Sequence, residues 1–448
     1  RPPAADPGAL GALDVVVALG RPEAVDPRLT GARHGVWSLR VGAARTPTDE
    51  ALLFWEHRDG DASVAVRLEL GAADQATPHT LECAWTAIDA VSLQRSRAAA
   101  CDKPATLVRR ALHRLHHEGT AALDGGPPPA PEPTRGHPPA RTLARHAARV
   151  AAGVLGRRLQ GAVSREAWYV AYRPRAPDAG AGLPSAASRP WTPLRAPLDH
   201  VYADPFLIER EGRHWLFLED YSYRAGKAGI ACVELTPDGP RGVPETVLEE
   251  DGHLSYPFVF EADGAMYLLP ESSASGRIAL YRAHDFPRGW ALEHVLVPAT
   301  RAMDPTLLRH DGRYWLFAAV QAPGSLFADD LCIWWASALA GPWRAHPLNP
   351  VVSDVRRARP AGAFLTGDAG LIRPGQDCSR GYGHAITLSR VEVLSTRDYR
   401  ERPVGRIEPD WGPGVLATHS YNRDAGYEVI DANRRLPMLR RPGARPRH

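Results

Sequence analysis

A strand–turn–strand unit recurs five times along this chain and most constrains its fold. The clearest copy is Asp204–Asp220, in which apolar side chains alternate on either side of a Glu-Gly turn. The copies begin at five anchors: Pro205, Pro257, Pro305, Pro360 and His419. A glycine follows each anchor by seven residues, and the anchors lie 52, 48, 55 and 59 residues apart. A period of about 50 residues built on strand hairpins is typical of propeller blades, so the sequence predicts a five-bladed β-propeller over residues 165–435.

A smaller α/β unit is predicted ahead of the propeller, over residues 1–117. At 448 residues the chain exceeds one typical domain, so a second unit is expected. The elements predicted for it are a buried parallel strand at 13–19, a strand at 34–40, a helix or strand at 52–57, an alternating strand at 63–70 and a helix at 105–117. The predicted fold class is therefore mainly β, with a five-bladed β-propeller preceded by a small, partial α/β domain.

A proline-rich segment separates the two predicted units. Residues 125–141 read GGPPPAPEPTRGHPPAR, which cannot form the interior of a helix or sheet. Residues 118–164 are therefore predicted as a linker that contains a helix at 141–159. The run AWYVAYR at 167–173 has the composition of a strand, and in a propeller it is a candidate for closing the ring with the last blade. Residues 436–448 are expected to form a disordered tail.

Charge and cysteine usage exclude several classes of function. The net charge of +3 is spread over the chain and forms no basic stripe, so nucleic acid is not expected as a partner. The five cysteines are scattered and form no C-x-x-C pair, which argues against a zinc site or a disulfide framework. A reducing cytoplasm is the simplest location. No apolar run of about 18 residues is present, so no transmembrane segment is expected.

Acidic residues recur where the predicted blades begin. In an antiparallel hairpin the start of the first strand lies beside the end of the second, which pairs Asp204 with Glu219 and Tyr256 with Glu271. With the first strand of each blade innermost, the residues predicted to ring the axial mouth are Asp204, Tyr256, Asp304, Arg359 and Thr418 or His419. Converging carboxylates suit glycosyl transfer, which needs one ionised group and one that keeps a proton. The alternative is structural, because Asp-Pro is also a common turn device.

Other segments are polar where packing between blades favours apolar side chains. They lie at 253–258 in blade two and at 353–360 and 373–379 in blade four. The arginines of blade four suit a phosphate or a sugar carboxylate. The alternative is that Arg356 and Arg373 pair with Asp354 and Asp377. The predicted substrate-binding residues are Glu219, His253, Tyr256, Arg359, Arg373, Gln376, Asp377 and His419.

The N-terminal unit resembles a known family. The order LDVVVAL, HGVWSLR and then LLFWEH…ASVAVRLEL is similar to the second half of formyltransferase domains of the methionyl-tRNA formyltransferase kind. In that family an Asn-x-His pair lies on the second of these strands and an Asp follows the last. This chain has Ser38 and Arg40 at the first two positions, and Asp74 is the nearest acid at the third. The resemblance therefore implies a degenerate, partial domain that does not transfer formyl groups.

The repeats carry a second and more specific resemblance, over most of residues 165–435. The segments ADPFLIEREGRHWLFLED, HLSYPFVFEADGAMYLLPES, DPTLLRHDGRYWLFAA, SDVRRARPAG and RPGQDCS together resemble the N-terminal domain of glucosamine inositolphosphorylceramide transferases. The blade pattern is more distantly similar to family 43 glycoside hydrolases, which are five-bladed propellers. By this resemblance Asp204 is the base or nucleophile, Glu271 the proton donor and Asp304 the orienting carboxylate. In the plant transferases, sugar transfer is assigned to a separate C-terminal domain.

These observations lead to three functional hypotheses. The first is an enzyme, a glycosyltransferase or glycoside hydrolase, that acts on a glycosidic bond in polysaccharide or glycoconjugate metabolism and takes a saccharide, nucleotide sugar or phosphosugar. The second is a non-catalytic glycan-binding module, and the third is formyl transfer. No organic cofactor is expected. Fructan-active families related to the hydrolases place a divalent cation in some axial channels, and here His419 is the candidate ligand for such a cation.

Overall fold

The computed structural model describes residues 13–19, 31–42, 51–71, 78–124, 135–175, 190–321, 328–367 and 370–437. These residues fall into two compact units. The first contains the described residues up to Ala148 together with Val352–Asp354, and the second contains the rest. Each unit has its own hydrophobic core, so each is described by itself.

The first unit is a four-stranded sheet with helices. The sheet order is β1 (Val16–Ala18), β2 (Val36–Val41), β3 (Ser63–Gly71) and β4 (His79–Ala87), and the helices are α1 (Phe54–Asp59), α2 (Leu93–Cys101), α3 (Pro104–Glu118) and the 3-10 turn η5 (Gly119–Leu123). The predicted parallel strand at 13–19 is confirmed, since β1 pairs in parallel with β2. Its predicted burial is wrong, because β1 is an edge strand whose side chains are mostly only partly buried. The segment at 52–57 is helical, and sequence reasoning missed β4 and α2.

The positions singled out by the formyltransferase resemblance have structural partners in this unit. Ser38 is buried on β2, opposite Glu69 of β3. The guanidinium of Arg40 lies 2.9 Å from the Glu69 carboxylate, so this charge is already paired. Asp74 lies outside the described residues. The formyltransferase resemblance of residues 1–117 stays a prediction.

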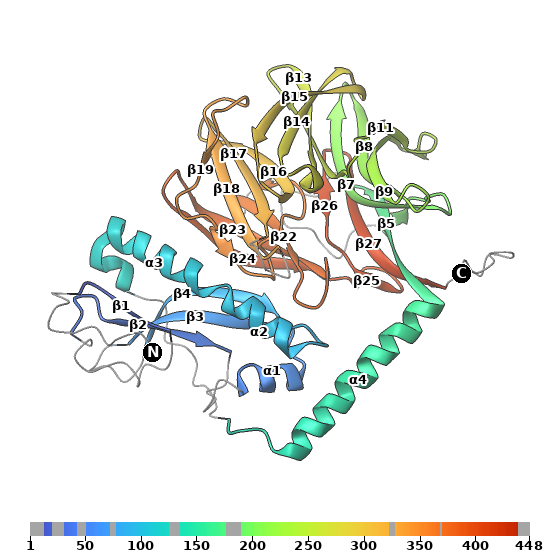
Figure 1. Cartoon of the computed structure of the whole chain (residues 1–448). Coiled ribbons are helices and arrows are strands. Elements are labelled where there is room, and N and C mark those ends of the chain that lie inside the picture. Colours follow the sequence, from blue (N-terminus) through green and yellow to red (C-terminus); the bar gives the residue numbers. More distant parts are fainter. Residues whose placement is uncertain are drawn as a thin grey trace. The chain divides into compact units, whose positions relative to one another are not determined.

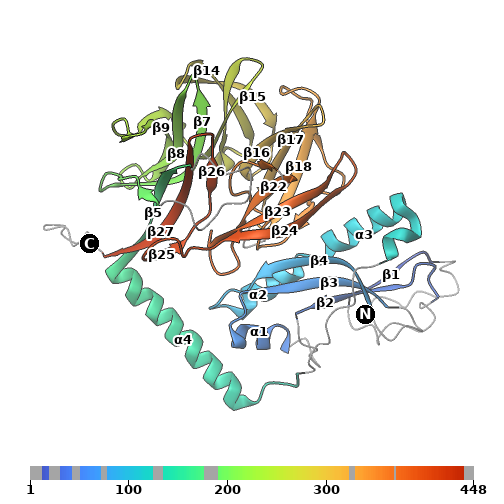
Figure 2. The same ribbon diagram turned by 180° about the vertical axis from the view of Figure 1, so that it is seen from behind.

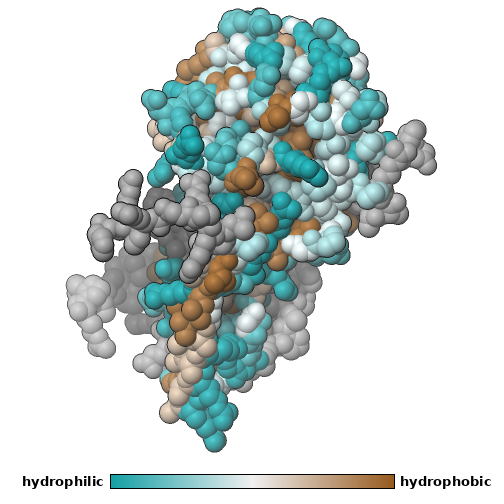
Figure 3. Space-filling view, turned by 90° about the vertical axis from the view of Figure 1, so that its right-hand side faces the viewer, coloured by the Kyte–Doolittle hydropathy of each residue, from teal (hydrophilic) through white to brown (hydrophobic). Residues whose placement is uncertain are grey.

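A long helix, α4 (Ala140–Val163), leads toward the propeller and confirms the helix predicted at 141–159. None of its side chains is buried, and apolar residues gather along one side of it (Figure 3). The predicted proline-rich linker falls mostly on residues 125–134, which lie outside the described residues. Across the described residues, no helix combines the length and the apolar content that a membrane crossing requires.

The second unit is a ring of five antiparallel sheets, which confirms the predicted five-bladed propeller (Figures 1 and 2). Blade one contains β7 (His200–Arg210), β8 (Arg213–Ser222), β9 (Lys227–Thr236), β10 (Gly239–Pro240) and β11 (Glu245–Leu248). Blade two contains β12 (Ser255–Ala262), β13 (Ala265–Glu271), β14 (Ile278–Asp285) and β15 (Arg288–Val297), with the turn η6 (Ser273–Ser275) after β13. Blade three contains β16 (Ala302–His310), β17 (Arg313–Val320), β18 (Asp330–Ala336) and β19 (Arg344–Ala345), and β20 (Val352–Ser353) follows it. Blade four contains β21 (Leu365–Gly367), β22 (Gly370–Asp377), β23 (Ala385–Leu394) and β24 (Tyr399–Ile407).

The fifth blade joins the two ends of the propeller. It contains β25 (Val415–Ala417), β26 (Tyr421–Arg423), β27 (Tyr427–Pro437), β5 (Ser164–Pro174) and β6 (Thr192–Pro193). Strand β5 pairs with β27 along its whole length, from Ser164 opposite Pro437 to Pro174 opposite Tyr427. This confirms that the run at 167–173 closes the ring. It also corrects the expected tail, because β27 extends to Pro437 and only residues 438–448 lie outside the described residues.

The repeated anchor has a structural cause. At the start of β7, β12 and β16 the pairing register shifts, as it does at a β-bulge. In β7 the shift lies between Ala203 and Phe206. The residue before the anchor proline has a positive φ in all three blades: 49° at Asp204, 47° at Tyr256 and 52° at Asp304. A bulge re-aims its side chain out of the pleat, so equivalent residues of three blades are turned toward the ring axis.

Candidate functional site

Five ionisable residues from different blades form what we call the axial cluster: Asp204, Glu271, Asp304, Arg359 and His419. The first strands of blades one, two and three contact one another, and β7 also contacts β26 and β27 of blade five. The bulges at Asp204 and Asp304 therefore bring these two carboxyls into one another's electrostatic field. Convergence at the axis was predicted from the period, and the structure shows it.

At three junctions between blades, a backbone amide of one blade donates to a carboxylate of the preceding blade. The Asp204 amide donates to Oδ2 of Asp431 at 3.2 Å, and the Tyr256 amide donates to Oδ2 of Asp204 at 3.2 Å. The Asp304 amide donates to Oε2 of Glu271 at 3.1 Å. Each bulged amide, which has left the strand ladder, is thus satisfied by an acid of the preceding blade. These carboxylates hold the ring together as well as facing its axis.

Asp204 is a buried carboxyl with a strongly perturbed proton affinity. Its side chain accepts a hydrogen bond from the Ser420 hydroxyl at 2.8 Å, and its Oδ1 lies 3.6 Å from Nε2 of His419. Only 4% of the residue is exposed. Burial raises the pKa of Asp204 to about 7, since the His419 charge only partly offsets it while Glu219 and Asp304 add to it. A carboxyl with a pKa near neutrality is suited to taking up and releasing a proton.

His419 lies between two carboxylates. Its Nδ1 is 2.5 Å from Oδ2 of Asp431, and its Nε2 faces Asp204. The pKa of His419 is raised to about 9. Burial alone would lower this pKa, but the two nearby carboxylates, Asp431 more strongly than Asp204, outweigh the effect of burial. The indole of Trp168 stacks on the imidazole with 4.0 Å between ring centroids. At neutral pH the ring is therefore a cation held by Asp431.

The cation predicted at His419 was tested against the donor set around it. One atom each from Asp204, His419 and Asp431 lie within 4.8 Å of one another. However, Asp431 already accepts the amides of Asp204, His419 and Ser420. Both imidazole nitrogens also face carboxylates, so a metal ion would have to displace the imidazolium proton. The divalent cation predicted at His419 stays a prediction, with Asp204, His419 and Asp431 as the residues that could hold it.

Asp304 is clamped from two sides. The Nε of Arg359 donates to its Oδ2 at 2.5 Å and the side chain of Gln376 donates to the same oxygen at 2.7 Å. Only 1% of Asp304 is exposed. Burial raises the pKa of Asp304 to about 7, opposed by Arg359 and reinforced by Glu271. Asp304 thus fixes the position of the Arg359 guanidinium. The Arg359 side chain is closer to solvent than the Asp304 carboxyl.

Glu271 does not have the surroundings expected of a proton donor. Its Oε1 accepts from the Ser273 hydroxyl at 2.8 Å, its Oε2 accepts the Asp304 amide, and Arg359 lies 3.5 Å away. Only 8% of the residue is exposed. Both oxygens therefore serve as acceptors for groups of the protein. Its position supports the bulge at Asp304 and does not support the predicted donor role.

More accessible groups surround the axial cluster. Nε2 of His253 lies 3.3 Å from Oε1 of Glu219, and this hydrogen bond raises the pKa of His253. Both side chains are partly exposed. Tyr382, with 48% of the residue exposed, lies under the guanidinium of Arg359 at 4.9 Å, and its hydroxyl is 3.3 Å from Nη2. The rim thus offers one titratable pair and an aromatic ring.

Four predicted substrate-binding residues are buried and bonded within the protein, which contradicts their prediction. Tyr256 is 0% exposed, and its hydroxyl bonds to Thr306 and accepts the Gly362 amide, because its ring packs between blades. Arg373 forms two 2.7 Å bonds to Glu401, so the structural alternative holds with a different acid from the one expected. The others are Asp377, which pairs with Arg406, and Gln376, which holds Asp304. His419, which was also predicted to bind substrate, is likewise buried and is paired with Asp431.

Sequence reasoning missed several residues of the site. Ser420 and Asp431 come from the last blade, where the repeat is weakest. Trp168 lies on the closing strand, outside the repeats altogether. Tyr382 follows the segment 373–379, which was singled out for its arginine and acid. Because the run at 167–173 was predicted to close the ring, Trp168 within it could have been recognised as a site residue.

Comparisons with known proteins agree with the resemblance read from the repeats. Residues 191–409 match the family described as "Glucosamine inositolphosphorylceramide transferase 1, N-terminal". The chain is 37% identical over 203 residues to glucosamine inositolphosphorylceramide transferase 1 of Arabidopsis thaliana, covering 44% of this chain and 26% of the relative. It is 34% identical over 209 residues to the protein of the same name from Oryza sativa subsp. japonica, covering 45% and 28%. The chain thus spans about a quarter of the length of these relatives.

Solved structures with partial likeness are enzymes that act on glycans. A Clostridium thermocellum exo-β-1,3-galactanase matches with a TM-score of 0.38 and 16% identity, covering 50% of this chain and 53% of that one. A family 117 glycoside hydrolase from Zobellia galactanivorans matches with a TM-score of 0.38 and 12% identity, covering 53% and 85%. Over residues 191–409 this chain is therefore similar to the N-terminal domains of glucosamine inositolphosphorylceramide transferase 1.

Proposed function

We propose that the propeller binds a saccharide over the axial cluster and acts on a glycosidic bond, with Asp204 as the acid–base group. The observation that carries this proposal is the pair of buried carboxyls, Asp204 and Asp304, each with a pKa raised to about 7 and each presented by an equivalent bulge. The family match adds support, since the relatives are named glucosamine inositolphosphorylceramide transferase 1.

The proton chemistry follows from the groups around Asp204. A carboxyl of near-neutral pKa takes a proton from an attacking hydroxyl, whether that hydroxyl belongs to water or to a sugar acceptor. The His419 imidazolium, 3.6 Å from Oδ1, stabilises the ionised form before attack, and Ser420 fixes the orientation of the carboxyl. Hydrolysis and transfer therefore make the same demand on Asp204. A nucleotide sugar or phosphosugar as donor belongs to this proposal.

The leaving oxygen needs a second group, and the rim supplies it. His253 shares its Nε2 proton with Glu219, and the pair is more accessible than Glu271. We assign the donor role to this pair in place of Glu271. Arg359, fixed by Asp304, presents its remaining guanidinium edge beside Tyr382, where it donates to sugar hydroxyls or an anionic substituent.

A specific observation favours the second candidate, a glycan-binding module without catalysis. The three predicted catalytic acids all accept hydrogen bonds from the protein and are nearly unexposed. A carboxylate used to hold neighbouring blades together needs no substrate to explain its burial. Turnover, and not binding, therefore decides between the two functions.

The test uses the full chain with a panel of glycosides, nucleotide sugars and phosphosugars. Binding is measured by calorimetry and turnover by product analysis. Asp204→Asn is expected to keep binding within about threefold while lowering kcat by about 100-fold or more, the usual contribution of a general base. Asp311→Asn, in an exposed turn where φ is already positive, is the matched control and keeps both.

Two results would decide against parts of the proposal. If the wild-type chain binds a saccharide but turns none over with any donor, the propeller is a binding module. If Asp204→Asn turns over substrate as fast as the wild type, Asp204 is not the acid–base group. A bell-shaped pH profile whose acidic limb is absent from the variant supports the assignment, because that limb reports ionisation of Asp204.

A further inference from the structure

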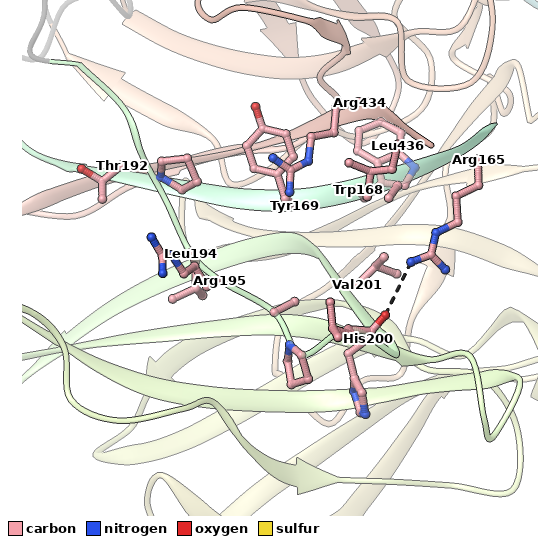
Figure 4. Close-up of a pocket in the computed structure, with 15 residues that line it drawn as sticks. Arg165, Trp168, Tyr169, Thr192, Leu194, Arg195, His200, Val201, Arg434 and Leu436 are labelled. Atoms are coloured by element: carbon pink, nitrogen blue, oxygen red, sulfur yellow. Dashed lines mark hydrogen bonds between the residues drawn. The ribbon is translucent and has the colours of Figure 1, made fainter. Parts of the chain in front are cut away.

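A pocket of about 600 Å³ (Figure 4) is lined by none of the five residues of the axial cluster. One wall comes from β5 and β27 of blade five, and the other from the segment that leads into β7 of blade one. Trp168 belongs to both places, because it lines the pocket and stacks on His419. A ligand in this pocket is therefore a neighbour of one bound over the axis.

The pocket is lined by three arginines and by no acidic residue. Arg165, Arg195 and Arg434 line it, and none of them forms a salt bridge within the described part of the chain. Arg165 donates to the Leu198 carbonyl at 3.5 Å, which leaves most of its donors unused. Arg435, the neighbour of Arg434 that does not line the pocket, is by contrast paired with Glu166 at 3.1 Å.

Aromatic rings orient two of the three arginines. The guanidinium of Arg434 lies 4.9 Å from the ring centroid of Tyr169, and that of Arg165 lies 4.5 Å from that of Tyr223. Such stacking holds the planar fork without neutralising its charge. His200 also lines the pocket, and its Nδ1 is bonded to Asp220 at 2.6 Å.

We propose that this arginine pocket, defined by Arg165, Arg195 and Arg434, binds the phosphate ester of a sugar or polyol. Guanidiniums without counter-ions match a phosphate, which accepts paired N–H donors. Trp168 and Tyr169, neighbours on β5 whose side chains point to opposite faces of the strand, both line the pocket and offer aromatic contacts to a sugar or polyol ring. The volume suits a ligand of this size. The proposal does not depend on catalysis at Asp204.

The experiment titrates the full chain with glucose 1-phosphate, glucose and inorganic phosphate by calorimetry. Glucose 1-phosphate is expected to bind at least about tenfold more tightly than either of the other two probes. Of the three, only glucose 1-phosphate has a phosphate for the arginines as well as a sugar for the aromatic rings. The double variant Arg165→Gln/Arg434→Gln is expected to lose about tenfold or more of that affinity. Arg435→Gln is the matched control and binds as the wild type does. Near-ultraviolet circular dichroism checks that the double variant is folded.

The source of the phosphate ester is distinguished in a second arm. Vesicles of phosphatidylcholine with and without phosphatidylinositol are sedimented with the chain. Binding that requires phosphatidylinositol and is lost in the double variant identifies a lipid headgroup, whereas binding of glucose 1-phosphate alone identifies a soluble ester. Both outcomes support the pocket.

Three outcomes overturn the proposal: equal binding of glucose and glucose 1-phosphate, an unchanged affinity in the double variant, or no binding of any phosphate probe in either arm. Asp204→Asn separates this proposal from the proposed function. The arginine pocket predicts that this variant binds glucose 1-phosphate normally, whatever happens to turnover. A failure of catalysis therefore leaves the pocket standing, and a failure of the pocket leaves the acid–base assignment standing.

Discussion

Replacing Asp204 with Asn is expected to change how the stability of the propeller depends on pH. The pKa of Asp204 is raised from its ordinary value of 3.8 to about 7 in the folded chain. Between these values the folded state binds a proton that the unfolded state has released, so the free energy of unfolding falls as pH rises. A shift of this size corresponds to at most about 4 kcal/mol lost between pH 4 and pH 7. The loss is then complete, and it persists above pH 7.

Asparagine keeps the shape of the side chain but has no charge to bury. Its carbonyl still accepts from the Ser420 hydroxyl or the Tyr256 amide. The variant is therefore expected to match the wild type near pH 5 and to exceed its stability at pH 8. The interaction with the His419 cation is lost, but burial outweighs that attraction in the wild type, as the direction of the pKa shift shows.

The assay is urea unfolding followed by tryptophan fluorescence at pH 5, 6, 7 and 8, with Asp311→Asn as the exposed control. Asp304 also titrates in this range, so both proteins lose some stability, and the difference in slope is the measured quantity. Equal slopes for the wild type and Asp204→Asn would refute the reasoning. That result would mean that Asp204 is ionised at pH 5, and the acid–base role would lose its basis.

Three other substitutions test individual contacts. Arg359→Met is expected to destabilise the chain by about 3 kcal/mol at pH 8 and by less at pH 5, because losing the guanidinium raises the pKa of buried Asp304 further. Urea unfolding at both pH values measures the loss of stability. An equal loss at the two pH values would contradict the prediction. Tyr256→Phe is expected to cost about 1–3 kcal/mol, because it leaves the buried Gly362 amide unsatisfied and removes the bond to Thr306, whose hydroxyl still donates to the Asp304 carbonyl. Saccharide affinity is expected to be unchanged, and a calorimetric loss of affinity would restore Tyr256 as a ligand-binding residue. Arg373→Met is expected to lower the free energy of unfolding by about 3–5 kcal/mol, and the double variant Arg373→Met/Glu401→Leu is expected to lower it much less. If the double variant is no more stable than the single variant, the Arg373–Glu401 pair is not what stabilises blade four.

The fold was predictable because blade geometry repeats in the sequence itself. In blades one to three the inner hairpin turns at a residue pair such as Glu211-Gly212, and both members of the pair have positive φ. Such two-residue turns match the twist of the strands and favour glycine at the second position. Asp204 and Asp304 were found by the same route, since the bulge that turns them inward recurs at a fixed distance from the turn glycine.

Pairing partners could not be predicted in the same way, because they depend on contacts between strands and blades. Sequence proximity offered Asp377 as a partner for Arg373, which instead bonds to Glu401 on β24. Asp431 and Trp168 reach the axial cluster only because β5 and β27 close the ring. These interactions join the first and last parts of the propeller, a proximity that no local pattern encodes.

The bulges show why burial of these acids does not by itself establish catalysis. A positive φ is tolerated by aspartate but is strained for a bulky residue such as Tyr256, which nevertheless adopts it. In blades one to three the fold therefore imposes this geometry on the residue that precedes the anchor proline, whether it is aspartate or tyrosine. In blades one to three the amide freed by the bulge is satisfied by an acid of the preceding blade: Asp431, Asp204 and Glu271 in turn. Loss of activity on removing Asp204 is accordingly evidence for catalysis only when it is measured per folded molecule and follows the titration of that carboxyl.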